Sequence, residues 1–366
     1  MNAPQASVVT AALQRALQQE YPSSATIIQL IFIDALDQTV SHSDWTLISR
    51  ALNLNPLRKR LNRKATPMIV RSKPNLIGIL FSLKGSIARR IALRSLLVTL
   101  LASVIVLVES WHPAWFSRVN AMPFTLLGLS LSIFMSFRNN ACYDRWWEGR
   151  KQLGQLIIEV RSLIRETQVV KGGDERERLL RELCGFAHGL IARLRGEDEA
   201  AASRPWVRGV IDHHHPNVTD SLLQRIGARC SALAEQKRIS EWRYVQLETR
   251  LVSLSLVQAS CERIKTTPLP FPYTLLLHRT IYLFCILLPF AMAEPLGWLA
   301  PIFTAIVSYT FFGLDEIGDD LEDPFGFDEN DLPCNAIVRT IEREVLGALG
   351  QADLPAILEP LDYVLS

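Results

Sequence analysis

Carboxylates are concentrated in one short stretch of the chain, residues 315–331. This stretch contains nine Asp or Glu residues and no Lys or Arg. Hard oxygen ligands at this density could hold Ca²⁺, but their order does not match an EF-hand loop, and the turn Pro324-Phe325-Gly326 interrupts them. A solvated acidic face and a partner for basic segments are the two other interpretations, and composition alone favours these over a cation site.

Other side chains with metal-binding or nucleophilic chemistry lack the spacing that such chemistry needs. Residues 213–215 are three histidines, but adjacent histidines cannot share a helical face and Pro216 follows them, which favours an exposed loop. The six cysteines form no CxxC pair, and we interpret them as reduced thiols. The sequence has no phosphate-binding glycine loop and no GxSxG motif, so it predicts a protein that is not an enzyme.

The composition excludes further classes of protein. The chain has 366 residues, 49% of them hydrophobic, and 39 basic against 37 acidic residues leave a net charge of +2. A protein that binds nucleic acid needs a basic excess on one face, and a disordered chain has fewer apolar residues. The apolar residues gather instead in long stretches, which is typical of a membrane protein.

Four stretches are predicted to span a membrane as helices, at about residues 91–110, 120–137, 273–293 and 295–314. The second and the fourth contain no charged residue. The first and the third are interrupted by Arg94 and by Arg279, so their assignment depends on the charges that flank them.

Those flanking charges are distributed asymmetrically. Basic residues precede the first stretch, follow the second and precede the third. The short connection after the first stretch has one basic residue, Arg118, and the connection after the third has none. By the positive-inside rule, both termini and residues 138–265 face the cytoplasm. Apolar residues spaced by three and four predict long cytosolic helices over 138–265, with almost no strand. We therefore expect an all-α protein of the cell's inner membrane with a large cytosolic helical domain.

The second stretch has an apolar face of its own. Leu129, Ile133 and Phe137 are four residues apart and therefore lie on one side of a helix. In a homo-oligomer with this helix at the axis, they would form stacked rings that constrict a pore. The alternative is that they face lipid, and periodicity alone leaves both interpretations open.

Three side chains at membrane depth carry or can carry a positive charge, namely Arg94, His278 and Arg279. A charge that is unpaired in hydrocarbon is costly, so such side chains face other helices or water. We expect them to pair between helices, with Glu109 or Asp144 as partners.

Several motifs, in the same order along the chain, resemble the bacterial branch of the bestrophin family over about residues 68–346. They are Lys84-Gly85-Ser86, Phe137-Arg138-Asn139-Asn140-Ala141-Cys142-Tyr143 with Arg145, Cys261-Glu262-Arg263-Ile264, His278-Arg279-Thr280 and Glu322-Asp323-Pro324-Phe325-Gly326.

The resemblance implies a homopentamer in the lipid bilayer, with four spans per protomer and one axial pore that conducts ions passively. It favours anions, chloride first, although some bacterial relatives pass cations. A non-conducting membrane scaffold or sensor, with cytosolic helices as its docking surface, is the alternative from another class. Residues 1–67 would be an N-terminal extension or linker, 68–346 the channel domain and 347–366 a C-terminal tail.

The resemblance also assigns residues to parts of the pore. Members of the family have a narrow membrane neck lined by three apolar residues, and the matching positions are Leu129, Ile133 and Phe137. A second, cytosolic aperture matches Trp242. Eukaryotic members gate through a Ca²⁺ clasp, whose acidic positions match Asp320, Asp323, Asp328 and Asp331.

Two departures from the family pattern matter. Phe327, Glu329 and Asn330 stand in a motif that is almost continuously acidic in eukaryotic members, so we do not expect Ca²⁺ as a cofactor. The residues before Met68 have no counterpart in the family, and Met68 matches the usual bacterial start. Residues 1–67 are therefore either an extension or the result of a start codon assigned too far upstream.

Overall fold

The computed structural model describes residues 87–112, 120–170, 173–212 and 215–359. All regular elements in these ranges are helices, and no strand occurs in them, which confirms the predicted all-α class. The predicted extension, residues 1–67, lies outside the described residues, as do His213 and His214.

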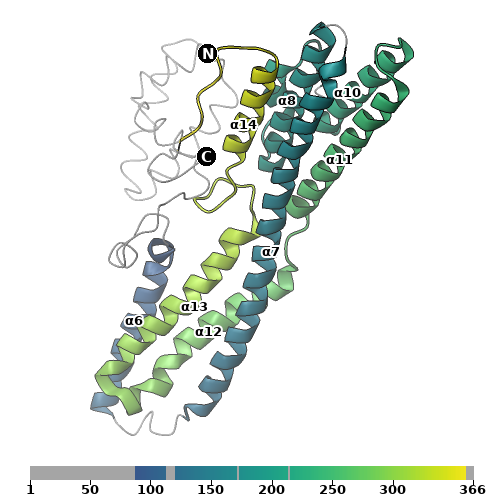
Figure 1. The fold of residues 1–366 in the computed structure, drawn as a ribbon. Helices are drawn as coiled ribbons and strands as arrows, with labels where there is room; N and C mark the ends of the chain where they lie inside the picture. The colour runs from purple at the N-terminus through teal and green to yellow at the C-terminus, as the bar shows by residue number, and fades with distance from the viewer. Residues whose placement is uncertain (1–86, 113–119, 171–172, 213–214, 360–366) are drawn as a thin grey trace, which may run out of the picture. The chain divides into compact units, whose positions relative to one another are not determined.

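Four helices form a bundle, seen in the lower half of Figure 1. They are α6 (Ala88–Trp111), the first half of α7 (Met122–Glu166), α12 (Phe271–Leu296) and α13 (Ala300–Glu322). Inside the bundle, Leu131, Met135 and Ile281 belong to one buried apolar cluster. The 3₁₀ turn η3 (Gly297–Leu299) joins α12 to α13, and Gly297 adopts a φ of 51°, which glycine tolerates and larger residues avoid.

The outer faces of this bundle are apolar. Two helical stretches of the described chain, Ala88–Trp111 and Phe271–Glu322, are long and apolar enough to cross a membrane by length and composition alone. Large apolar side chains on α6, α12 and α13 are exposed, for example Leu97, Leu283 and Ile306. A water-soluble bundle would cover such surfaces, whereas lipid is a suitable solvent for them.

Helix α7 joins the bundle to a second group of helices. Its 45 residues form one uninterrupted α-helix, about 67 Å long at 1.5 Å per residue. The predicted border between membrane and cytosol, at residues 137 and 138, therefore lies inside a continuous helix. One continuous helix therefore extends from the bundle into the second group, and the membrane position of its first half stays a prediction.

The second group consists of the end of α7 with α8 (Gly173–Arg195), α9 (Glu199–Ser203), α10 (Val218–Glu235), α11 (Glu241–Thr266) and α14 (Cys334–Ala348). Short 3₁₀ turns follow α7 (η1, Thr167–Val169) and α9 (η2, Arg204–Trp206). The side chains of Asn217 and Ser240 cap α10 and α11 by accepting backbone N–H groups. One large apolar core holds these helices together and includes Leu156, Phe186, Leu254 and Ile341.

The loop between α13 and α14 packs against the middle of α7. Phe325 is fully buried, and a Cβ added to Gly149 of α7 would lie 3.1 Å from its ring. A side chain at this position would require the Phe325 ring to shift by a few tenths of an ångström. The turn Pro324-Phe325-Gly326 therefore anchors the acidic stretch to the helix that spans both groups.

Candidate functional site

The three residues predicted for a pore neck lie together on one face of α7. Leu129 is 60% exposed, Ile133 47% and Phe137 60%, and none of them packs in the core of the protomer. The opposite face of the same helix buries Leu131 and Met135 against the bundle. The protomer thus presents an apolar stripe (Leu129, Ile133 and Phe137) that its described helices leave uncovered. Whether this stripe lines a pore stays a prediction.

Directly beyond the stripe, α7 carries a fully buried cation. Arg138 has no exposed surface, and its Nη1 donates to Asp315 Oδ1 at 2.9 Å and to the Asp315 backbone oxygen at 3.3 Å. Its Nη2 donates to Asp319, also on α13, and lies 3.9 Å from Glu322 Oε2. Burying a guanidinium is costly unless it is paired and hydrogen-bonded, and these acids supply the partners.

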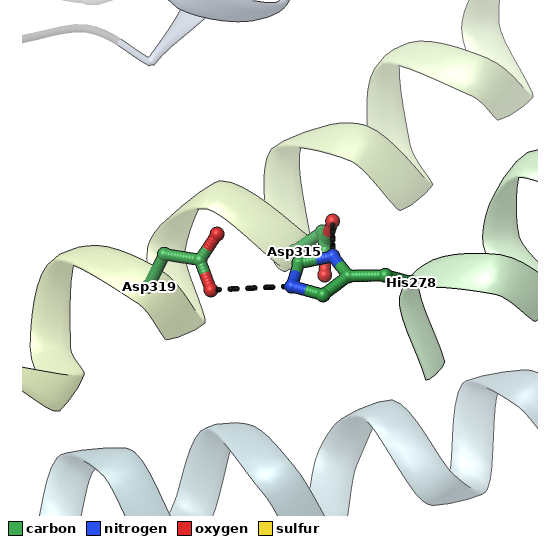
Figure 2. Close-up of side chains that lie close together, drawn as sticks. All are labelled: His278, Asp315 and Asp319. Atoms are coloured by element: carbon green, nitrogen blue, oxygen red, sulfur yellow. Dashed lines mark hydrogen bonds and ion pairs between the residues drawn. The ribbon is translucent and has the colours of Figure 1, made fainter. Parts of the chain in front are cut away.

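His278 of α12 joins the same cluster, as Figure 2 shows. Its Nδ1 lies 2.6 Å from Asp315 Oδ2 and its Nε2 lies 3.7 Å from Asp319 Oδ1. One atom each of His278, Asp315 and Asp319 lie within 4.8 Å of one another, which is close enough to hold a metal ion. Both carboxylates are already bonded to Arg138, however, so the geometry is that of an ion-pair cluster joining α7, α12 and α13.

A second ionic cluster joins the start of α6 to the other side of α13. Arg94 Nη1 donates to Glu316 Oε2 at 3.1 Å. Arg90 donates to Asp320 through Nη1, and its Nη2 lies 3.4 Å from Asp328 Oδ1. The acidic stretch is therefore a partner for basic segments, as one of the two interpretations from composition predicted.

The partners that we predicted for Arg94 and His278 were wrong, and Arg279 makes no ion pair with the described residues. Arg94 and His278 pair between helices as expected, but with Glu316 and Asp315 rather than with Glu109 or Asp144. Glu316 lies 222 residues from Arg94 in sequence, and Asp315 lies 37 residues from His278. The one sequence signal for these two acidic partners is that residues 315–331 contain no basic residue that could neutralise them locally.

The four carboxylates that match the Ca²⁺ clasp do not converge on one point. Asp320 and Asp328 share the Arg90 guanidinium, and Asp323 Oδ2 accepts from Lys265 Nζ at 2.6 Å. Asp331 is 2% exposed, and its Oδ2 accepts the Asp328 N–H at 2.6 Å. A Ca²⁺ ion needs six to eight oxygens around it, without a cation among them. The residues as they lie do not fit this ion.

Asp331 has an unusual protonation equilibrium. Burial raises the pKa of its carboxyl to about 7, and the nearby carboxylates of Asp328, Asp323 and Asp320 act in the same direction. The hydrogen bond from the Asp328 backbone opposes this rise. Asp331 therefore prefers a proton in the folded protein below neutral pH.

Trp242, predicted to line a cytosolic aperture, lies in the first turn of α11 and is 84% exposed. It belongs to the second group of helices, whereas the stripe belongs to the bundle (Figure 1). Other large apolar side chains of α11 are also exposed, at Val245, Val252 and Leu256. The exposed Trp242 side chain can face an axis or another protomer, and its place in a cytosolic aperture stays a prediction.

Comparisons with known proteins give a consistent picture. A sequence profile of the family described as "Bacterial/Fungal Bestrophin protein" matches residues 68–347. Over 293 residues the chain is 40% identical to a voltage-dependent anion channel-forming protein of Mesorhizobium japonicum, and the match covers 79% of this chain and 95% of that protein. A protein of the same description from Escherichia coli is 36% identical over 299 residues, with 80% and 98% covered.

Solved structures agree with the sequence comparison. A bacterial bestrophin homologue from Klebsiella pneumoniae matches with a TM-score of 0.69 and 35% identity, over 72% of this chain and all of the other. A point variant of a protein described simply as a membrane protein matches with the same TM-score of 0.69 and 36% identity, over 72% of this chain and 99% of the other. The helical architecture described above is therefore that of a membrane protein.

Replacing Arg138 with Met is expected to destabilise the bundle strongly. The change leaves Asp315 buried without its guanidinium partner, which costs about 3–5 kcal/mol in free energy of unfolding. The measurement is the midpoint of thermal unfolding in detergent. Arg161→Met is the control, because Arg161 pairs with Glu344 at the surface and its loss costs less than about 1 kcal/mol. Equal shifts for both variants would contradict the structural role of Arg138.

Addition of Ca²⁺ at millimolar concentration is expected to leave the unfolding midpoint unchanged. A ligand raises stability only if it binds the folded state, and Arg90 and Lys265 already pair with three of the four clasp carboxylates, Asp320, Asp323 and Asp328. Mg²⁺ at the same concentration controls for ionic strength. A rise with Ca²⁺ alone would mean that the loop rearranges to hold the ion.

The pH dependence of stability is expected to report on Asp331. Its folded pKa, about 7, lies above the value of about 3.9 in an unfolded chain, so its contribution to stability is complete below about pH 4 and is lost as the pH rises to about 7. Asp331→Asn keeps the hydrogen-bond acceptor but cannot ionise. Between about pH 5 and about pH 8, the wild-type midpoint should fall relative to that of the variant; parallel curves would show that the carboxyl is ionised throughout.

Proposed function

The chain belongs to the bacterial and fungal bestrophin family, and on this premise we propose that it is a passive channel that conducts anions, with chloride as the main ion. The Mesorhizobium japonicum and Escherichia coli relatives are described as voltage-dependent anion channel-forming proteins. The family is one of membrane channels, not of enzymes. No nucleic acid partner is part of this function.

We propose that the protomer crosses the inner membrane four times and assembles as a homopentamer around one axial pore. The four spans are α6, the first half of α7, α12 and α13. The exposed apolar side chains on these helices support contact with lipid and with neighbouring protomers. Both termini and the group of helices around α8, α10 and α11 lie on the cytoplasmic side in this arrangement.

The exposed stripe of α7 is the observation that carries the proposal. Five copies of Leu129, Ile133 and Phe137 around an axis form a narrow apolar neck, and such a constriction gates by dewetting. The neck provides no coordinating oxygen, so selectivity arises from the field of the pore and from partial dehydration of the ion. Trp242 lines a second constriction at the cytosolic end in the same arrangement.

Two other functions compete with anion conduction. A cation-selective channel has the same neck, because an apolar stripe does not favour either sign of charge. A non-conducting scaffold or sensor uses the cytosolic helices as a docking surface, and it predicts that widening the stripe changes no current. The reversal potential under a salt gradient separates these three functions.

Widening the neck is expected to increase the current. In planar bilayers under a KCl gradient, the variant with Leu129, Ile133 and Phe137 changed to Ala should pass larger currents than the wild type, because the larger opening stays hydrated. Leu96→Ala is the control, since Leu96 is an exposed apolar residue of α6, away from the stripe. Absence of current from the wild type and the triple variant would overturn the proposed function.

A further inference from the structure

The face of α7 that carries the stripe continues beyond Phe137 toward the cytosolic helices. Successive residues of an α-helix are turned by about 100°, so positions 140, 144, 147 and 151 share the side of the stripe. Asn140, Asp144, Trp147 and Lys151 are all exposed. On the opposite side, the buried positions of the helix include 138, 142, 149 and 153. One continuous face thus leads from the apolar stripe to a sequence of polar and charged residues.

Asp144 is the first ionisable side chain on this face after the stripe. It is exposed and makes no hydrogen bond or ion pair with any residue in the described ranges. Two other arginines of the same helix point elsewhere. Arg138 is buried with Asp315, and Arg145 donates to the backbone oxygens of Ile264, Thr267 and Glu322. The Asp144 charge is therefore not neutralised by the described part of the protomer.

Lys151 follows Asp144 two turns later, about 10 Å farther along the helix axis. It too is exposed and has no ion pair or hydrogen bond with the described part of the chain. Along this face, the apolar stripe is followed by Asn140, Asp144, Trp147 and Lys151, and the two charged side chains have no partner in the described part of the chain.

We propose that Asp144 and Lys151 set the ion selectivity of the pore, as a ring of carboxylates just inside the neck and a ring of ammonium groups below it. The proposal rests on the proposed function, because it requires five copies of α7 around the axis. The apolar neck contributes no charge, so the first fixed charges beyond it determine the local concentrations of anions and cations. Rings of acidic side chains favour cations and rings of basic side chains favour anions. Selectivity is then a balance in which Asp144 opposes anion flow and Lys151 supports it.

The test compares reversal potentials of channels in planar bilayers under a KCl gradient. Asp144→Asn has the same shape without the charge, and it should raise the chloride-to-potassium permeability ratio about fivefold, the order expected for five screened charges about 10 Å from the ion. Lys151→Gln should lower the ratio. Asp353→Asn removes an exposed carboxylate after α14 and should leave the ratio unchanged.

A second measurement is the dependence of the permeability ratio on ionic strength. If Asp144 had only a structural role, its effect on this ratio would not depend on salt. At about 1 M salt the Debye length is only about 3 Å, so the difference between Asp144→Asn and the wild type should shrink. If all proteins conduct but Asp144→Asn has the wild-type ratio, the inference is wrong while the channel function stands. If neither the wild type nor the widened neck conducts, the proposed function fails and this inference fails with it.

Discussion

The burial of the Arg138 guanidinium is the constraint on which the bundle depends. A charged side chain with no exposed surface has to be paired, and its acids come from a single helix, α13. The two helices approach closely there, because a Cβ on Gly318 would lie 2.9 Å from Arg138 Nη1. Fixing position 138 inward also fixes the rotation of α7. Phe137, one residue earlier, is turned outward as a consequence, together with Leu129 and Ile133.

Much of this architecture could be predicted from the sequence, because helical periodicity and long apolar stretches are local signals. The exposed stripe on α7 follows from a spacing of four, and the continuous helix beyond it follows from the pattern of apolar residues. The partners in ion pairs, in contrast, lie far apart in the sequence, so no local pattern identifies them. The acids at 315, 319 and 322 face Arg138, whereas those at 316 and 320 face the basic start of α6. Composition showed one acidic stretch, and only the structure separates it into two sides of a helix.

Side chains from several helices hold the loop after α13. Arg90 of α6 contacts Asp328 in the loop, Trp146 of α7 donates to the Asn330 backbone oxygen at 3.1 Å, and Arg195 of α8 lies 4.6 Å over the Phe327 ring. Groups from three helices thus hold the loop in place. The carboxylates of this loop contribute to the packing of the protomer.

The uninterrupted length of α7 has a mechanical consequence. Arg138 is one of the points that fix the helix, and about 42 Å of its axis lie between this point and Glu166 and about 13 Å between it and Leu129. A rigid rod that pivots there moves its short end by about one third as far as its long end, in the opposite direction. A sideways displacement of the helix end near Glu166 by a few ångströms would therefore change the position of Leu129 by about one ångström. Forces applied to the second group of helices would be transmitted to the stripe by leverage, without any change in the helix itself.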